Sequence, residues 1–401
     1  MHSKLKTVLI AVVFIFLTAS LIANPQASLE ASIRGLNIWW EVVFPSLLPF
    51  FVVAELLIGL GIVSFIGVLL EPLMRPLFRV PGIGGFVWAM GMASGFPSGA
   101  KLSVRLRQTN QLTQIEAERL VSFTNSSNPL FIFGAVSVGF FHNPDLGIIL
   151  AASHYISNIG VGLLMRFHGI TLHEKQTMSK KPFSIRHAFH MLHQKRIEEK
   201  RPIGKMLGDA IVSSIQTLLM IGGFIILFSV INKMMTVVHI TDLFSSIIQH
   251  FLAFLQLPTS FGIPLLSGMF EITLGSQMAS QTENATLLQQ TLVTSFILAF
   301  SGLSVQAQVA SILAETDIRF KPYFIGRIIQ SILAPICTYL LWKPLYEDAH
   351  SFHPQQYDLP VFLPQPISNW HIFSTYGPII TLICLYLYIF LLFRRARKRM
   401  R

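Results

Sequence analysis

The chain has 401 residues, of which 52% are hydrophobic and only 12% are charged. Soluble domains carry about 25% charged residues, so this composition excludes an ordinary soluble enzyme and predicts an all-α polytopic membrane protein. Lys and Arg outnumber Asp and Glu by 30 to 19, but the basic residues gather in loops and in the C-terminal tail. That distribution is typical of topogenic charge in membrane proteins and argues against a nucleic-acid partner.

The segment 1–41 predicts one transmembrane helix followed by an outer interfacial segment. A basic start precedes the apolar residues 7–23, and residues 24–41 carry the aromatic pair Trp39 and Trp40. Aromatic rings of this kind suit the headgroup level of a bilayer. A cleaved signal peptide is the alternative interpretation, because a basic start also precedes the apolar core of such peptides.

The segment 42–167 predicts three spans and one broken, re-entrant element. Its centre is the motif Gly91–Lys101, in which three glycines, a proline and small or hydroxylic residues interrupt an apolar run. Lipid-exposed irregular backbone is not tolerated in a bilayer, so a broken segment at that depth lies against protein or lines a polar cavity. The expected elements are a span at 42–60, a re-entrant hairpin at 62–100, an inside surface helix at 101–119, a span at 120–141 broken at 124–129, and a span at 146–167.

The segment 168–205 is predicted to be a basic, His-rich cytoplasmic loop. It holds nine Lys or Arg residues and five histidines, and His187, His190 and His193 recur at every third position. Three histidines on one helical face can bind a metal ion, but no cysteine or carboxylate completes a site here. A solvated basic loop is therefore the preferred interpretation, and no metal is predicted.

The segment 206–342 repeats the order of elements of the first broken unit. Gly91-Met92 aligns with Gly268-Met269. Ser122-Phe123 aligns with Ser295-Phe296, and a polar break follows each of these pairs. The first unit begins outside and the second begins inside, which predicts inverted repeats with a substrate site near the bilayer midplane. The expected elements are spans at 206–232, 291–313 and 323–342, a broken stretch at 239–277 and a polar break at 301–306.

The remaining segments complete the predicted topology. Residues 343–370 read as a Pro-rich outer loop, and residues 371–401 as a last transmembrane helix with a basic tail. The predicted inverted-repeat transporter then has about eight transmembrane helices and two re-entrant hairpins, with most basic residues and both termini inside. Cys337 and Cys384 both lie in apolar runs, so no disulfide framework is expected.

Two runs of sequence carry a resemblance to known families. SGFPSGAK at 94–101 and FTNSSNPLFIFG at 123–134, within the order of elements at 42–167, resemble the nucleoside-recognition or gate domain of concentrative nucleoside transporters and the ferrous-iron transporter. More closely, essentially the whole chain resembles the YlbJ-type sporulation integral membrane proteins of endospore-forming bacteria. The resemblance implies a transporter that moves dipicolinate (pyridine-2,6-dicarboxylate) out of the mother cell, across the outer forespore membrane.

The candidate site residues come from the motif and from the polar breaks. Hydroxyls and amides of the motif can contact a carboxylate, and Lys101 can neutralise one charge or anchor at the membrane edge. Glu271 is an intramembrane carboxylate that would repel an anion, so we expect it to hold a coupling proton or cation, or to pair with a basic residue. The predicted substrate-binding set is Ser94, Gly95, Ser98, Gly99, Lys101, Thr124, Asn125, Ser126, Ser127, Asn128, Ser301, Ser304 and Gln306.

Several alternatives stay open from the sequence. A nucleoside or cation carrier of the same fold is the strongest rival, while a structural protein of spore assembly gives no reason for broken spans. An intramembrane enzyme acting on lipid is a weaker alternative, because the sequence has no Gly-x-Ser-x-Gly elbow, zinc-binding His-Glu-x-x-His motif or phosphate loop. No enzyme activity and no cofactor are predicted. Arg75 and Arg79 lie one helical turn apart and are either interfacial or part of a dicarboxylate site.

Overall fold

The computed structural model describes residues 2–169, 185–198, 201–254 and 256–348. All elements assigned in these residues are helices, which confirms the predicted all-α fold. Four of the described helices are long and apolar enough to cross a membrane, and up to six spans result if each of two bent helix pairs counts as one. The predicted C-terminal helix, most of the predicted outer loop and Cys384 lie outside the described residues.

The chain begins with two helices that meet in a sharp bend at a proline. α1 (His2–Ala23) and α2 (Pro25–Asn37) meet at Asn24, and the helix pair is bent by 103°. Proline lacks a backbone N–H and disfavours helical geometry in the residue before it, so the helix breaks at this point.

The segment after this bend, which the sequence predicts to be interfacial, packs along α11 on one side and is exposed on the other. α2 lies along α11 (Ile203–Val237), and a Cβ atom at Gly35 would collide with the α11 backbone. Trp39 is buried, and its indole N–H donates to the Leu218 carbonyl of α11 at 2.8 Å. The Trp39 ring is therefore held by α11, whereas Trp40 beside it is 60% exposed.

The first repeat follows α2 through a π-helical turn, η1 (Ile38–Val43). It contains one long helix, one amphipathic helix, a helical hairpin, a broken helix and a last long helix. These elements are α3 (Phe44–Gly59), α4 (Ile62–Phe78), α5 (Ile83–Ser94), α6 (Ser98–Gln108), α7 (Gln114–Thr124), the π-helical η2 (Leu130–Phe140) and α8 (Leu146–Met165).

The hairpin of the first repeat lies further along the chain than the sequence predicts. Its arms are α5 and α6, so Lys101 belongs to the second arm instead of beginning a surface helix. α4 is a separate helix, bent by 84° from α3 and packed against α10 (Ile185–Glu198). The difference arises because Pro72 and Pro76, which we interpreted as breaks, are accommodated inside α4. The chain turns only at Arg79, whose φ of 54° is left-handed.

The second repeat has the same order of elements as the first. α11 is its long helix, α12 is amphipathic, α13 and α14 form the hairpin, α15 and α16 form the broken helix, and α17 is the last long helix. The bounds are α12 (Ile240–Phe254), the 3₁₀ turn η3 (Thr259–Phe261), α13 (Gly262–Phe270), α14 (Ile272–Ser280), α15 (Leu287–Phe300), α16 (Gly302–Leu313), α17 (Phe320–Trp342) and the π-helical η4 (Lys343–Glu347).

The two broken helices begin with the same local device. Thr113 and Glu116 form a capping box at the start of α7, and Thr286 and Gln289 form the equivalent box at the start of α15. In each box the threonine hydroxyl accepts from the backbone N–H of the residue three positions later. The side chain of that later residue, Glu116 or Gln289, accepts from the threonine backbone N–H. Both boxes satisfy amides that a helix N-terminus leaves without intrahelical partners.

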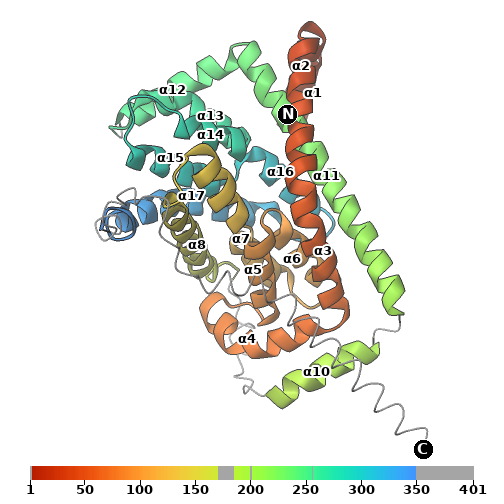
Figure 1. The fold of residues 1–401 in the computed structure, drawn as a ribbon. Coiled ribbons are helices and arrows are strands. Elements are labelled where there is room, and N and C mark those ends of the chain that lie inside the picture. Colours follow the sequence, from red (N-terminus) through yellow and green to blue (C-terminus); the bar gives the residue numbers. More distant parts are fainter. Residues whose placement is uncertain (1, 170–184, 199–200, 255, 349–401) are drawn as a thin grey trace, which may run out of the picture. The chain divides into compact units, whose positions relative to one another are not determined.

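Contacts between the repeats show that they run in opposite directions. The start of α7 lies beside the end of α16, because Gln114 donates to the Asp317 carbonyl at 2.6 Å. The end of α14 lies beside the end of η2, because Ser280 Oγ donates to the Phe140 carbonyl at 3.2 Å. The amphipathic helices α4 and α12 accordingly lie at opposite ends of the described helices (Figure 1).

The main apolar core belongs to both repeats. It joins side chains from α4 to α8 of the first repeat with side chains of α16 and α17 of the second, and Leu120, Phe123, Val309 and Tyr323 are fully buried in it. Burial of apolar surface is the main stabilising term in folding. The repeats are therefore halves of one folded unit.

Candidate functional site

The break in the first hairpin packs directly against the break in the first broken helix. Gly95 joins the two arms with a φ of 87°, a backbone conformation that favours glycine. A Cβ atom at Gly91 or at Gly99 would collide with the Thr124 carbonyl at the end of α7. Glycine at these positions lets the hairpin approach the backbone of the broken helix, which explains the small residues of the motif.

Two asparagines tie the hairpin to the broken helix. The Asn125 side chain accepts from the Ala100 N–H at 3.0 Å and donates to the Val121 carbonyl at 3.0 Å. The Asn128 side chain donates to the Ser94 carbonyl at 3.1 Å and accepts from the Phe131 N–H at 2.7 Å. Each amide thus satisfies one helix end in the hairpin and one in the broken helix, where backbone groups lack intrahelical partners.

A buried arginine that sequence reasoning did not select holds the same break from the other repeat. Arg327 of α17 is fully buried. Its guanidinium donates to the Asn125 carbonyl at 2.9 Å, to the Ser122 carbonyl at 2.7 Å and to Asn158 Oδ1 at 3.1 Å. The signal for it was available, because a charged residue inside an apolar run is costly in a bilayer and is usually functional.

A histidine completes the wall behind this break. His154 of α8 is buried, and its Nε2 accepts from the Ser127 N–H at 3.0 Å. The Tyr155 hydroxyl donates to the Ser127 carbonyl at 3.1 Å. Both backbone polar groups of Ser127 are therefore satisfied by α8, which keeps the irregular segment in one position.

The second hairpin supplies its own cap. The Glu271 carboxylate accepts from the Thr273 N–H at 3.0 Å and from the Leu274 N–H at 2.8 Å, so it caps α14. In the broken helix of this repeat, Ser301 and Gly302 both have left-handed φ, and Gln306 donates to the Phe300 carbonyl at 3.0 Å. An acidic side chain at a helix N-terminus is stabilised by the helix dipole.

Three of the breaks, together with the start of α16 beside the fourth, line one cavity of about 520 Å³, which we name the break cavity. The two hairpins, the two broken helices and the long helices α3 and α11 contribute to its wall. Glu271 is the only charged side chain among the lining residues, and most of the others are apolar. The lining residues at or near the breaks are Ser94, Gly95, Phe96, Ser127, Asn128, Glu271, Ile272, Thr273, Ser304, Val305 and Gln308, and η2 adds Leu130, Phe131, Gly134, Ala135 and Phe140.

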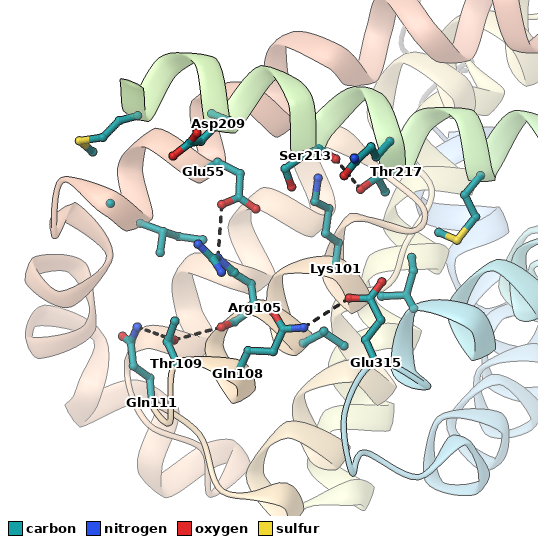
Figure 2. Close-up of a pocket in the computed structure, with 18 of the residues that line it drawn as sticks. Glu55, Lys101, Arg105, Gln108, Thr109, Gln111, Asp209, Ser213, Thr217 and Glu315 are labelled. Atoms are coloured by element: carbon teal, nitrogen blue, oxygen red, sulfur yellow. Dashed lines mark hydrogen bonds and ion pairs between the residues drawn. The ribbon is translucent and has the colours of Figure 1, made fainter. Parts of the chain in front are cut away.

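A second cavity of about 640 Å³ is lined by charged groups, and we name it the polar cavity. It lies between α3, α6, α11 and the end of α16 (Figure 2). Within it, Arg105 lies 3.4 Å from Glu55 and Gln108 lies 3.3 Å from Glu315. Arg201 and Asp209 form a further ion pair at 2.9 Å. Most charges of this cavity are therefore already matched.

Lys101 and Glu315 are the charged residues of the polar cavity without an ion pair among the described residues, and Lys101 is the buried one. Its side chain extends toward α11 (Figure 2) and is 9% exposed. Its ammonium is buried and has no hydrogen-bond partner among the described residues. The nearest aromatic contact is Phe51, whose ring centroid lies 4.4 Å from Nζ, which is a cation–π geometry. An unmatched buried cation beside open volume is suited to receive an anion.

The predicted site residues fall into three groups. Those in the break cavity are Ser94, Gly95, Ser127, Asn128, Glu271 and Ser304, and Lys101 lines the polar cavity. The others line neither cavity and pack beneath the breaks: Ser98, Gly99, Thr124, Asn125, Ser126, Ser301 and Gln306. Arg75 is paired with Glu71 and Glu116, and neither it nor Arg79 lines either cavity.

A second charged cluster that the sequence did not reveal joins the repeats. Glu118 is fully buried and accepts from Arg319 at 2.7 Å, and its other oxygen lies 2.6 Å from His168 Nε2. Burial raises the pKa of the Glu118 carboxyl, but the hydrogen bonds from Arg319 and His168 outweigh it and hold the pKa below its usual value. The cluster is a structural link between α7 and the segment before α17.

The described residues contain no group of three or more His, Cys, Asp or Glu side chains placed to hold a metal ion. Of the three histidines at 187–193, His190 and His193 are described on α10. His187 lies in the same helix, where its side chain is outside the described parts.

Comparison with known proteins agrees with the two repeats. The Gate family, described as nucleoside recognition, matches the chain twice, at residues 40–141 and 218–318. The chain is 59% identical over 396 residues to the sporulation integral membrane protein YlbJ of Bacillus subtilis (strain 168), and the alignment covers 96% of each protein. No solved structure matches the chain. Each Gate match ends just beyond the broken helix of its repeat.

Proposed function

Because the chain belongs to the family of the sporulation integral membrane protein YlbJ and contains two Gate domains, we propose that it is a membrane carrier for a small solute. The observation that carries this proposal is the convergence of four broken elements, from two inverted repeats, on one cavity. Transporters built from inverted repeats place their substrate sites at such breaks. The substrate we propose is dipicolinate, moved from the mother cell across the outer forespore membrane.

The Lys101 ammonium in the polar cavity supports a dicarboxylate as the substrate. Dipicolinate carries two carboxylates that are ionised near neutral pH, so a site for it needs fixed positive potential to offset dehydration. Lys101 supplies a buried ammonium without a hydrogen-bond partner among the described residues. A carboxylate beside it would form a charge-assisted hydrogen bond of the stronger kind.

The proposed direction of entry follows from the basic residues. Arg105 and Arg201 line the polar cavity. The basic segment 168–205 leads into the start of α11, a helix that lines this cavity. Basic loops face the cytoplasm in membrane proteins. We therefore place the polar cavity on the mother-cell side, with the termini also cytoplasmic, and the break cavity deeper along the route.

Glu271 is proposed to serve coupling and not substrate binding. Its carboxylate caps α14 and is the only charged side chain that lines the break cavity. A proton or cation bound there would lower the repulsion of an anion. Glu271→Gln should therefore change the pH or ion dependence of transport more than the affinity for dipicolinate.

The runner-up is a carrier of nucleosides or cations, and one observation favours it. The break cavity is mostly apolar and has an acidic side chain but no basic one. A neutral or cationic solute would fit that environment without the unmatched lysine. Transport requires the Lys101 charge in the first proposal and not in the second, so Lys101→Gln distinguishes them.

The test is binding of labelled dipicolinate and of labelled nucleosides to the purified protein, together with flux into vesicles. We expect dipicolinate to bind and Lys101→Gln to weaken its binding and flux about ten-fold to a hundred-fold, since a hydrogen bond to a charged group contributes about 1.5–3 kcal/mol. Lys101→Arg should retain part of the flux, because the charge survives while the geometry changes.

The matched control is Lys205→Gln, which removes an exposed lysine that does not line the polar cavity. Normal dipicolinate flux in Lys101→Gln, at normal expression, would contradict the role of this lysine. Binding of a nucleoside in place of dipicolinate would replace our proposal with the runner-up.

A further inference from the structure

The polar cavity and the break cavity share no lining residue, yet they follow one another along the same helices. On α3, Leu47 lines the break cavity, whereas Glu55 and Ile58 line the polar cavity. Phe51 lies between them in sequence at helical spacing and lines neither cavity. Along this face of α3, the Phe51 ring therefore lies between the residues that line the two cavities.

Two further helices show the same succession. On α11, Thr217 and Met220 line the polar cavity, and Ile221 and Ile225, which follow, line the break cavity. On α16, Gln308 lines the break cavity, and Ile312, one turn later, lines the polar cavity. Three helices therefore carry the two cavities in succession, and the order along α11 is the reverse of the order along α3 and α16, so the cavities lie end to end.

The layer between the cavities is built around Phe51, and Lys101 contacts the Phe51 ring from the polar cavity. Phe51 is 3% exposed and packs in an apolar cluster with Leu218 of α11. The Lys101 ammonium lies 4.4 Å from the centroid of the Phe51 ring. On the side of α16, Ser311 Oγ lies 3.3 Å from the sulfur of Met220. Contacts from α3, α6, α11 and α16 thus meet between the two cavities.

We infer that the Phe51–Lys101 contact is the barrier between two successive compartments of one solute route, and that an anionic solute opens it. The route itself rests on the proposed function, whereas the barrier rests on the geometry of the described residues. A carboxylate that enters the polar cavity offers the Lys101 ammonium a stronger partner than an aromatic face. When the ammonium moves toward the solute, it leaves the Phe51 ring. The Phe51 side chain can then move and open the layer between the cavities.

This arrangement also gives a reason for selectivity. A neutral solute has no charge with which to compete for the Lys101 ammonium. A cation is repelled by it. The same side chain therefore selects anions and controls access, which a membrane-edge anchor would not do.

The barrier is tested by the accessibility of a reporter cysteine in the break cavity. Ala135 lines that cavity from η2, and Ala135→Cys is made in a chain whose native Cys337 and Cys384 are replaced by alanine. The full-length protein is reconstituted in vesicles. A charged, membrane-impermeant thiol reagent is then supplied only from the side of the polar cavity.

We expect slow labelling in this parent and labelling at least about ten-fold faster in Phe51→Ala, because apolar constrictions block the passage of hydrated solutes. Phe51→Leu, which preserves an apolar side chain of moderate size, should give an intermediate rate if Phe51→Ala fails to fold. Ile58→Ala is the matched control, since it truncates an apolar side chain of α3 that lines the polar cavity but is outside the layer. Its labelling should stay at the parent rate.

Equal labelling of the parent, Phe51→Ala and Phe51→Leu would overturn the barrier. Dipicolinate added with the reagent should accelerate labelling of the parent but not of Lys101→Gln. Acceleration by Phe51→Ala without any effect of dipicolinate would uphold the barrier while rejecting dipicolinate as the solute that opens it. Acceleration by a nucleoside in the parent would overturn the selectivity for anions.

Discussion

The two repeats share an order of elements but hold their breaks in different ways. In the first repeat, Asn125 and Asn128 of the broken helix cap the ends of the hairpin, and Arg327 of the other repeat caps the broken helix. In the second repeat, Glu271 caps its own hairpin. The first break is therefore tied to its neighbours by several side chains, whereas the second is closed within one element.

This difference indicates which wall of the break cavity is fixed. Moving the first hairpin relative to its broken helix would leave buried helix ends without partners, and each such group is costly. The cap of the second hairpin moves with the hairpin and loses no partner. We therefore expect the second hairpin to be the wall that moves during transport, and the following predictions test this asymmetry.

The largest effect is expected for Arg327→Met. This change leaves the Ser122 and Asn125 carbonyls buried without their charged donor. Each unsatisfied group costs about 1–3 kcal/mol, so the loss in free energy of unfolding should reach roughly 2–6 kcal/mol. Lys321→Met, at an exposed position of the same helix, is the control for loss of charge. Thermal unfolding in detergent measures both, and equal stability of the two variants would show that the first break is not held by this arginine.

A smaller difference is expected between the amides of the two broken helices. Asn125→Ala removes hydrogen bonds to Ala100 and Val121, whereas Gln306→Ala removes one to Phe300. With about 0.5–1.5 kcal/mol for each bond, Asn125→Ala should lower the free energy of unfolding about twice as much as Gln306→Ala. Chemical unfolding of the two variants gives the comparison directly. A larger cost for Gln306→Ala would reverse the proposed asymmetry.

The smallest effect concerns the surface link between the repeats. Arg107 and Asp317 pair at 2.8 Å, and the hydrogen bond from Arg107 lowers the pKa of the Asp317 carboxyl. The stabilisation is then complete above the ordinary carboxyl pKa and disappears as the pH falls through the lowered value. Asp317→Asn should cost about 0.2–1 kcal/mol at neutral pH and nothing in strong acid. A cost independent of pH would show that the charge of Asp317 contributes no stability.

Much of the fold could be predicted from the sequence because the evidence is periodic and compositional. Apolar runs, the Gly91–Lys101 motif and the match of Gly268 with Gly91 predicted an all-α membrane protein of two repeats, and the Gate matches confirm this family. The boundaries of the first hairpin were not predictable from prolines alone. Pro72 and Pro76 fit within α4, where packing against neighbouring helices outweighs the local preference of the residue.

The site was only partly predictable for a different reason. Polar residues within an apolar run predict irregular backbone. The sequence does not show which of their side chains line the cavity and which cap a helix. Asn125 and Gln306 turn inward to backbone groups, whereas Asn128 and Ser304 line the break cavity. Arg327 was passed over because it lies in an otherwise ordinary span, and its partners come from about 170 to 205 residues away in sequence.

The most direct test of the account is whether the two hairpins end on opposite sides of the membrane. Gln108 ends the first hairpin and Glu283 follows the second, and both residues are exposed. Single cysteines at these positions, in a chain without Cys337 and Cys384, are labelled with an impermeant reagent in sealed vesicles of one orientation. We predict labelling of one position from outside and of the other only after the vesicles are opened. Labelling of both from the same side would contradict the inverted repeat and, with it, the shared cavity at the breaks.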